Sequence, residues 1–267
     1  MAPKQVILDL GQSLIQTGPR KTLPTSRRVR AIHNHSVIVD TTEAVYVWEQ
    51  DYYPTIYVPL KDVKNCEIRD EKNISGDGKA RATLAELVVP PHDGIEAVKI
   101  EGVLRFSDDD SLGALAGTVR IQFGSINQWL EEDAPIYIHP KDPFKRVDIL
   151  PSQRRVQVQI NRKTIADATS SMHLFETGLP TRFYLPLASV DQSVLRPSEL
   201  KTRCPYKGEA QYYHVVVDGQ EIKNIVWYYR FPTHESAAIA GLVCFYNEKV
   251  DIILDGELQT QPRTKFA

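Results

Sequence analysis

Apolar and polar residues alternate along much of the chain. Residues 155–160 read Arg-Val-Gln-Val-Gln-Ile, and residues 118–123 read Thr-Val-Arg-Ile-Gln-Phe. A period of two places neighbouring side chains on opposite faces, so these runs predict half-buried β-strands. Asp93-Gly94, Asp218-Gly219 and Asp255-Gly256 lie between strand-like runs. These dipeptides favour tight turns and predict β-hairpins.

Helical patterns are short by comparison. One runs from Leu8 to Ile15, where the chain either forms a short helix or stays loose. Two more run from Ile126 to Glu132 and from Ala188 to Leu195. A parallel α/β sheet needs longer crossover helices than these. The pattern therefore predicts an all-β protein of antiparallel sheets with a few short helices.

The chain also contains an internal repeat. At an offset of 127 positions, Leu23-Pro24 falls on Leu150-Pro151, and Arg27-Arg28-Val29 falls on Arg154-Arg155-Val156. Further matches at this offset are Asn34, Asp40, Glu49, Tyr57 and Pro59 with Asn161, Asp167, Glu176, Tyr184 and Pro186. The offset shrinks to 125, where Arg105-Phe106 falls on Arg230-Phe231, and then to 124. Order and offset hold over about 95 residues, which is typical of a duplicated domain.

The repeat and the composition together set the domain organisation. We expect an N-terminal extension over residues 1–22, a first copy over 23–140, a linker over 141–149 and a second copy over 150–267. A Pro-rich stretch from His139 to Pro143 marks the joint between the two copies. With 42% hydrophobic and 25% charged residues, each copy is able to form a core.

Charge and hydropathy exclude several classes of partner. The net charge is −2, without the basic excess of a nucleic-acid-binding protein. No apolar run approaches the ~18 residues of a membrane span, and the N-terminus is not a secretory signal. Three scattered cysteines do not form a disulfide scaffold. We therefore expect a cytoplasmic protein that binds neither nucleic acid nor membrane. The pattern leaves the oligomeric state open.

The second copy carries a specific set of motifs. Residues 176–184 read Glu-Thr-Gly-Leu-Pro-Thr-Arg-Phe-Tyr, residues 204–208 read Cys-Pro-Tyr-Lys-Gly, and Trp227-Tyr228 follow. These motifs resemble a widespread domain family of unknown function that is labelled nucleotidyltransferase-like. The resemblance implies a β-tent fold, in which two antiparallel sheets lean together. The first copy looks like a diverged member, because Thr55 stands in place of Arg182 and the Cys-Pro-Tyr-Lys-Gly motif is missing.

Nucleotidyl transfer and metal binding are both disfavoured by spacing. The transferase reaction needs paired carboxylates for metal ions, but Gly124-Ser125 is followed only by Asp133. Related β-tent proteins bind zinc through two Cys-x-x-Cys knuckles, whereas no two cysteines here are closer than 40 positions. The second copy does not repeat the pair His33 and His35. We therefore expect no metal and no cofactor.

The motif residues suggest a polar site in the second copy. Arg182 and Tyr184 are two positions apart, so both lie on one strand face. Arg182 either anchors an anionic ligand or pairs internally with Glu176, and Lys207 either adds a second positive contact or is solvated. Cys204 is either a nucleophile or a buried turn residue. A base for that nucleophile would come from His214 or His173. The aromatic residues Tyr213, Trp227 and Tyr228 either line a pocket or belong to the core.

Two hypotheses about function follow. In the first, the protein is a cofactor-free enzyme that isomerises, cyclises or hydrolyses a small anionic metabolite. Its catalytic residues would be Glu176, Tyr184, Cys204 and Lys207, and its ligand-binding residues Arg182, Tyr213, His214, Trp227 and Tyr228. In the second, the protein is a non-catalytic module that binds a small ligand or another protein. An enzyme should hold unpaired ionisable groups in a cleft, whereas a module should pair them.

Overall fold

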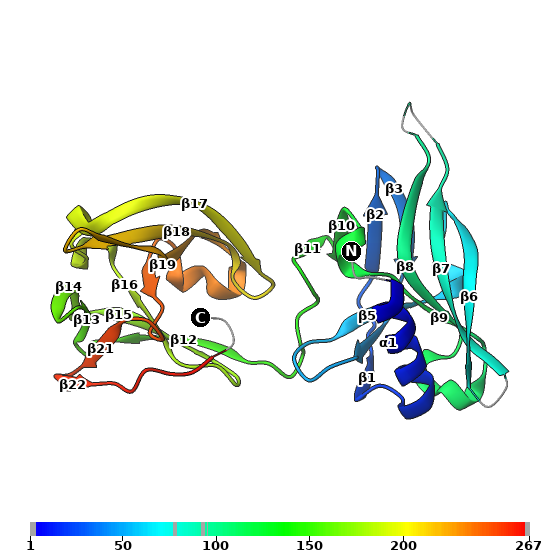
Figure 1. Cartoon of the computed structure of the whole chain (residues 1–267), viewed down its shortest axis with the longest axis horizontal. Coiled ribbons are helices and arrows are strands. Elements are labelled where there is room, and N and C mark those ends of the chain that lie inside the picture. The colour runs from blue at the N-terminus through cyan, green and yellow to red at the C-terminus, as the bar shows by residue number, and fades with distance from the viewer. Residues whose placement is uncertain (1–3, 77–78, 92–93, 95, 265–267) are drawn as a thin grey trace. The chain divides into compact units, whose positions relative to one another are not determined.

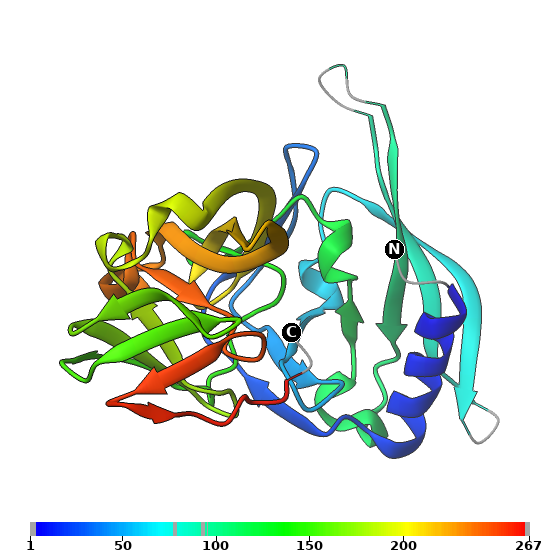
Figure 2. The same cartoon turned by 60° about the vertical axis from the view of Figure 1, so that its left-hand side comes forward.

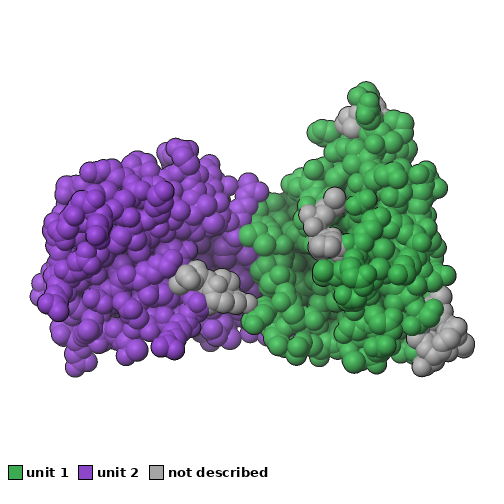
Figure 3. Space-filling view, viewed as in Figure 1, with its two compact units in different colours: residues 1–142 green, residues 143–267 purple. Residues whose placement is uncertain are grey.

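The computed structural model describes residues 4–76, 79–91, 94 and 96–264. The chain divides into two compact units, Met1–Asp142 and Pro143–Ala267 (Figure 3). Within each unit the strands form one seven-stranded and one four-stranded antiparallel sheet (Figure 1). The protein is therefore all-β, as the alternating pattern predicts.

The first unit begins with its only described α-helix, α1 (Lys4–Thr17). Its seven-stranded sheet has the order β1-β4-β5-β9-β8-β7-β6, and its four-stranded sheet has the order β11-β10-β2-β3. The strands are β1 (Lys21–Pro24), β2 (Val29–His33), β3 (Ser36–Thr41), β4 (Val45–Trp48), β5 (Thr55–Pro59), β6 (Glu67–Gly76), β7 (Lys79–Val89), β8 (Val98–Phe106), β9 (Thr118–Arg120), β10 (Gln128–Glu131) and β11 (Ala134–Ile136). Short 3-10 helices are η1 (Leu60–Asp62), η2 (Asp110–Leu115) and η3 (Phe123–Ser125).

The second unit repeats this topology. Its seven-stranded sheet has the order β12-β15-β16-β20-β19-β18-β17, and its four-stranded sheet has the order β14-β13-β21-β22. The strands are β12 (Val147–Ser152), β13 (Val156–Ile160), β14 (Lys163–Ala168), β15 (Ser171–Glu176), β16 (Arg182–Leu185), β17 (Leu195–Cys204), β18 (Gly208–Val217), β19 (Gln220–Pro232), β20 (Val243–Phe245), β21 (Asp251–Leu254) and β22 (Glu257–Leu258). Its 3-10 helices are η4 (Leu187–Ser189), η5 (Gln192–Val194) and η6 (His234–Ile239).

Each unit has one core between its two sheets and a second apolar cluster on the other face of the seven-stranded sheet. In the second unit the inner core includes Val158, Val215 and Val226. The outer cluster includes Leu174, Tyr184 and Trp227. Both faces of the large sheet are therefore buried over its central strands. We call the face away from the four-stranded sheet the outer face.

Most of the predicted local elements are present. The N-terminal stretch forms α1, and Asp218-Gly219 and Asp255-Gly256 form hairpin turns in which both residues have positive φ. Asp93 lies outside the described residues. The helix predicted from Ile126 to Glu132 is wrong, because this stretch forms strand β10, whose Trp129 and Leu130 are both buried.

The helix predicted from Ala188 to Leu195 is only partly present. This stretch forms two separate 3-10 turns, η4 and η5, with a break at Val190 and Asp191. Asp191 accepts a hydrogen bond from the backbone N–H of Ser193, which favours a turn over a continuous helix. Among the described residues, no helix has the length and apolar character needed to cross a membrane.

Candidate functional site

The motif residues of the second unit gather on the outer face of its large sheet. Tyr184 in β16 pairs in register with Cys244 in β20, which in turn pairs with Trp227 in β19. Tyr184, Trp227 and Cys244 belong to one buried cluster on this face. Glu176 ends the neighbouring strand β15, and Lys207 lies in the turn between β17 and β18. The alternation that predicts strands therefore also brings these side chains together.

Arg182 is held by partners that its motif does not contain. Its guanidinium donates two hydrogen bonds of 2.6 Å to the carboxylate of Glu248 and a third to the Asn247 side chain. The Arg182 and Glu248 side chains are only 13% and 4% exposed. The guanidinium also lies 5.4 Å from the Trp227 ring centre and 5.9 Å from that of Tyr246. Arg182 therefore forms an internal ion pair, as one of the two alternatives had it, but its partner is Glu248 and not Glu176.

Glu248 remains ionised in this environment. Burial opposes its charge, but hydrogen bonds from Arg182 and Thr264 outweigh burial and lower the pKa of Glu248. The Thr264 hydroxyl donates its bond at 2.8 Å. Both carboxylate oxygens of Glu248 are therefore already used within the protein. A ligand anion that reached Arg182 would have to displace a well-satisfied carboxylate.

Glu176 forms a second ion pair on the same face. Its Oε2 lies 2.5 Å from the Lys207 ammonium, and its Oε1 lies 3.7 Å from that of Lys145. The Glu176 side chain is 6% exposed, compared with 12% for Lys207 and 22% for Lys145. Gly208 fixes the turn that carries Lys207, because its φ is +99° and a Cβ there would lie 3.3 Å from the Phe231 carbonyl oxygen. Two ammonium groups thus share one carboxylate.

Tyr184 lies at the centre of the cluster and is fully buried. Its hydroxyl accepts a hydrogen bond of 3.1 Å from the indole N–H of Trp227. Burial raises the pKa of the Tyr184 phenol well above its usual value. Tyr184 therefore stays protonated at ordinary pH, which suits a structural or hydrogen-bonding role better than proton transfer.

The Cys204 thiol and the two candidate bases, His214 and His173, do not lie together. Cys204 ends β17 opposite Gly208, six positions along β18 from His214, which is about 20 Å in a strand. The Nδ1 atom of His214 accepts a hydrogen bond from the Asn224 backbone N–H. His173 contacts Phe183, which packs against the core between the sheets. The structure therefore does not assemble the predicted Cys–His pair.

The three candidate wall aromatics occupy two different faces. Trp227 belongs to the outer cluster, whereas Tyr213 and Tyr228 pack against the core between the sheets. The rings of Tyr213 and Tyr228 stack with their centres 5.1 Å apart. The partner of Trp227 is instead Tyr246, whose ring centre is 4.5 Å away. Tyr246 belongs to the sequence motif Gly241-x-Val-x-Phe-Tyr246 and follows β20 by one position, but the sequence analysis did not count it among the candidate site residues.

Strand registers identify the equivalent positions in the first unit. Tyr57 pairs with Arg120, as Tyr184 pairs with Cys244, so Arg120 and Cys244 are equivalent. Arg120 donates hydrogen bonds of 2.8 and 3.3 Å to the carboxylate of Glu49, and Tyr57 donates one of 3.1 Å to the same group. Although Thr55 replaces the motif arginine, the first unit obtains a buried cation from a different strand. An offset of 124 aligns Arg120 with Cys244 and would have revealed the exchange.

The registers also correct the repeat alignment in the next strand. Leu104 lies opposite Arg120, and Trp227 lies opposite Cys244. Because Arg120 and Cys244 are equivalent, Leu104 and Trp227 are equivalent as well. Phe106 is consequently equivalent to Tyr229, not to Phe231. Exposure agrees, since Phe106 and Tyr229 are 1% and 4% exposed but Phe231 is 81% exposed. The offset of 125 is therefore wrong at this point, and the registers give 123.

Helix α1 covers the outer face of the first unit (Figure 2). Ile7, Gly11, Leu14 and Ile15 form its buried stripe, with the spacing of an amphipathic helix. Gly11 allows close approach, because a Cβ there would lie only 2.6 Å from the Ile74 Cδ1 atom. Beneath the helix lie the apolar side chains of Ile74, Ala82, Leu84, Leu104 and Phe106. This face is therefore a packing surface.

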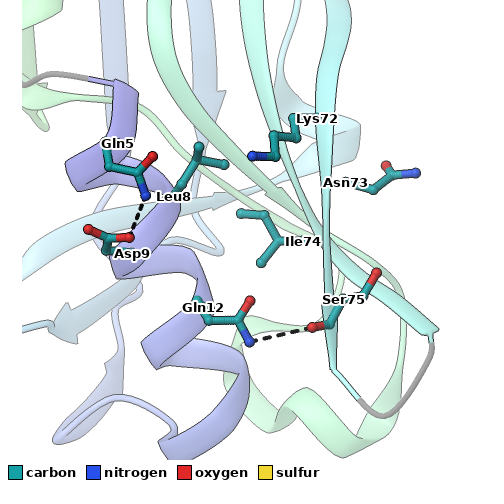
Figure 4. A pocket seen from close by; sticks show the side chains of 8 residues that line it. All are labelled: Gln5, Leu8, Asp9, Gln12, Lys72, Asn73, Ile74 and Ser75. Atoms are coloured by element: carbon teal, nitrogen blue, oxygen red, sulfur yellow. Dashed lines mark hydrogen bonds between the residues drawn. The ribbon is translucent and has the colours of Figure 1, made fainter.

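The first unit also has a hollow beside α1, between the helix and β6 (Figure 4). Its volume is about 210 Å³, and none of the predicted site residues lines it. Two of its amide side chains already form hydrogen bonds within the protein. Gln5 donates one to the Asp9 carboxylate, and Gln12 donates one to the Ser75 carbonyl oxygen. We therefore do not regard this hollow as the functional site.

Comparison with known proteins gives a family but no activity. The model of a domain family described as a domain of unknown function, DUF427, matches residues 21–112 and 148–256. The two matches fall in the two units and together cover most of the chain. No curated protein matches the chain.

Proposed function

The chain belongs to the DUF427 family and carries its domain twice, and from this premise we propose that the second unit is a small-ligand-binding module. One observation carries the proposal. The outer face packs under α1 in the first unit, whereas no α-helix is described in the second unit. In the second unit the short 3-10 helix η6 contributes Ile239 to the outer cluster, but no α-helix is described over it. A face that packs under an α-helix in one copy and lacks that cover in the other is the natural place for a ligand.

The side chains at equivalent positions support this difference. Leu84, Leu104 and Phe106 of the first unit correspond to Tyr212, Trp227 and Tyr229 of the second. Leucine and phenylalanine are purely apolar and suit helix packing, whereas tyrosine and tryptophan combine apolar area with a hydrogen-bonding group. Partly buried apolar side chains surround this cluster, namely those of Val147, Ile149, Met172, Leu242 and Tyr246. They offer a ligand apolar surface that is not fully covered.

The ionisable groups favour binding over catalysis. Arg182 is paired with Glu248, and Lys207 is paired with Glu176. Tyr184 stays protonated, and neither histidine lies beside Cys204. An active site usually keeps an acid or base ready to exchange a proton with the substrate. Pairing of this kind fixes side chains in place and therefore suits recognition of a ligand.

A thermal-shift screen of small molecules against the full chain tests the proposal. A ligand present at ~100 times its dissociation constant stabilises the fold by roughly 2.7 kcal/mol. The double variant Tyr212→Leu with Trp227→Leu gives this face an aliphatic lining like that of the first unit, and we expect it to lose the shift. Tyr228→Phe, on the opposite face of the same strand, should keep it.

Two results would overturn the proposal. The first is a ligand shift that persists unchanged in the double leucine variant, because the ligand would then bind elsewhere. The second is conversion of a bound compound into a product, detected by mass spectrometry and abolished in the same variant. That second result would favour the enzyme hypothesis, in which Cys204 or Lys207 acts on a small anionic metabolite.

A further inference from the structure

The charges on the outer face of the second unit do not cancel. Lys145, Lys207 and Arg182 contribute three positive charges to its ion pairs, and Glu176 and Glu248 contribute two negative charges. The sum is +1. Lys249, whose ammonium lies 5.3 Å from the Tyr246 ring centre, adds another positive charge and brings the sum to +2. The equivalent pair in the first unit, Glu49 with Arg120, is neutral.

The excess positive charge lies on the lysine side of the cluster. Arg182 and Glu248 balance each other in a bidentate pair. Glu176, in contrast, faces two ammonium groups, and Lys145 is the more distant at 3.7 Å and the more exposed at 22%. Lys145 also lies 5.9 Å from the ring centre of Tyr206. A partly buried cation beside a shared carboxylate is stabilised when a second anion approaches it.

Aromatic surface accompanies this charge. Trp227 and Tyr246 contact each other, and the Met172 and Leu242 side chains beside them are only partly buried. Flat rings and a flexible thioether favour a flat, apolar ligand body. A ligand with such a body and one negative charge would match both the surface and the charge of this face.

We infer that the ligand of the second unit is a planar, largely apolar carboxylate, which is anchored by Lys145 and Lys207 and packs against Trp227 and Tyr246. This inference rests on the proposed function and adds the ligand class and the anchoring residues. In this inference Lys145 and Lys207, and not Arg182, contact the anionic group of the ligand. A carboxylate would offset part of the excess positive charge without displacing Glu248.

Fluorine NMR of protein labelled with 5-fluorotryptophan tests the inference. Trp227 is the only tryptophan of the second unit, and Trp48 and Trp129 in the first unit act as internal controls. The probes are 1-naphthoate, its neutral analogue 1-naphthamide, and inorganic phosphate. We expect naphthoate to shift the Trp227 signal alone, naphthamide to bind about tenfold more weakly, and phosphate to give no shift.

Lysine variants then locate the anchor. Lys145→Met should weaken naphthoate binding about tenfold and leave naphthamide binding unchanged, because it removes charge and keeps the chain length. Lys201→Met is the matched control, since Lys201 on the edge strand β17 is 60% exposed and pairs with Glu209 and not with Glu176. Melting curves of both variants check that the fold is intact.

The outcomes separate the two proposals. Equal binding of naphthoate and naphthamide would overturn the carboxylate class but support a ligand site on this face. Unchanged naphthoate affinity in Lys145→Met would overturn the anchor. If no probe moves the Trp227 signal while another compound from the thermal-shift screen does, the ligand class is wrong and the module stands. If no compound moves it, both proposals fail.

Discussion

Removal of Arg120 should destabilise the first unit strongly. The Arg120 and Glu49 side chains are 8% and 13% exposed, so Arg120→Met leaves the Glu49 carboxylate buried without its cation. Among the residues that the structure describes, only the Tyr57 hydroxyl would still donate a hydrogen bond to it. Removing one partner of a buried ion pair costs roughly 3–5 kcal/mol, because the other charge stays desolvated. We expect a loss of that size.

An exposed ion pair in the same unit provides the matched control. Lys61 and Glu43 are 2.6 Å apart, but their side chains are 63% and 61% exposed. Lys61→Met should therefore cost at most about 1 kcal/mol. Urea unfolding followed by tryptophan fluorescence gives both values, and melting temperatures should differ by ~10 °C between the two variants.

A loss below about 1 kcal/mol for Arg120→Met would refute this reasoning. It would mean that water reaches Glu49 and hydrates the carboxylate when the arginine is removed. The outer face of the first unit would then not be sealed by α1, and the contrast with the second unit would lose its basis. The double variant Arg120→Met with Glu49→Gln distinguishes the cases, because it should recover part of the loss only if the unpaired charge causes it.

Three further predictions concern packing, thiols and pH. Ile7→Ala should cost about 2–4 kcal/mol in urea unfolding, whereas Val6→Ala, on the exposed side of α1, should cost under about 1 kcal/mol. Iodoacetamide should label the half-buried Cys204 before Cys244, because burial raises the pKa of the Cys244 thiol to about 12. The reverse order of labelling in mass spectrometry would contradict this. Because the pKa of Glu248 is lowered in the folded state, the Glu248 carboxylate stabilises the fold above pH ~4.5, and this contribution is lost as the pH falls through the folded-state pKa. An unchanged free energy of unfolding in Glu248→Gln at pH 7 would contradict this.

The fold was largely predictable from the sequence. The period of two and the hairpin dipeptides give antiparallel strands, and the repeat gives two copies of the same topology. The error at Ile126 to Glu132 has a physical cause. Its apolar residues Trp129 and Leu130 are adjacent and both buried, so the strand has no clear alternation. A short run of this kind does not distinguish a helix from a strand that is covered on both sides.

The site was predictable in its motif residues but not in their partners. Alternation places Arg182 and Tyr184 on one face, and the structure keeps them there. Glu248 follows Arg182 by 66 positions, and Lys145 precedes Glu176 by 31. Such ion pairs depend on long-range packing, which neither local spacing nor a motif specifies. The same limit applies to Tyr246, which reaches Trp227 from the end of another strand.

The role of α1 could not be predicted for a further reason. Central strands of the large sheets are buried on both faces; β9 and β20, for example, have no exposed residue. Their sequences therefore do not indicate which face meets the smaller sheet and which meets something else. In the first unit that second cover is a helix from outside the repeat. The second unit has no equivalent segment of that length before its first strand, and η6 contributes only Ile239 to the buried outer cluster. Our proposal assigns the place that α1 takes in the first unit to a bound ligand, which the aromatic residues and the excess positive charge of this face favour.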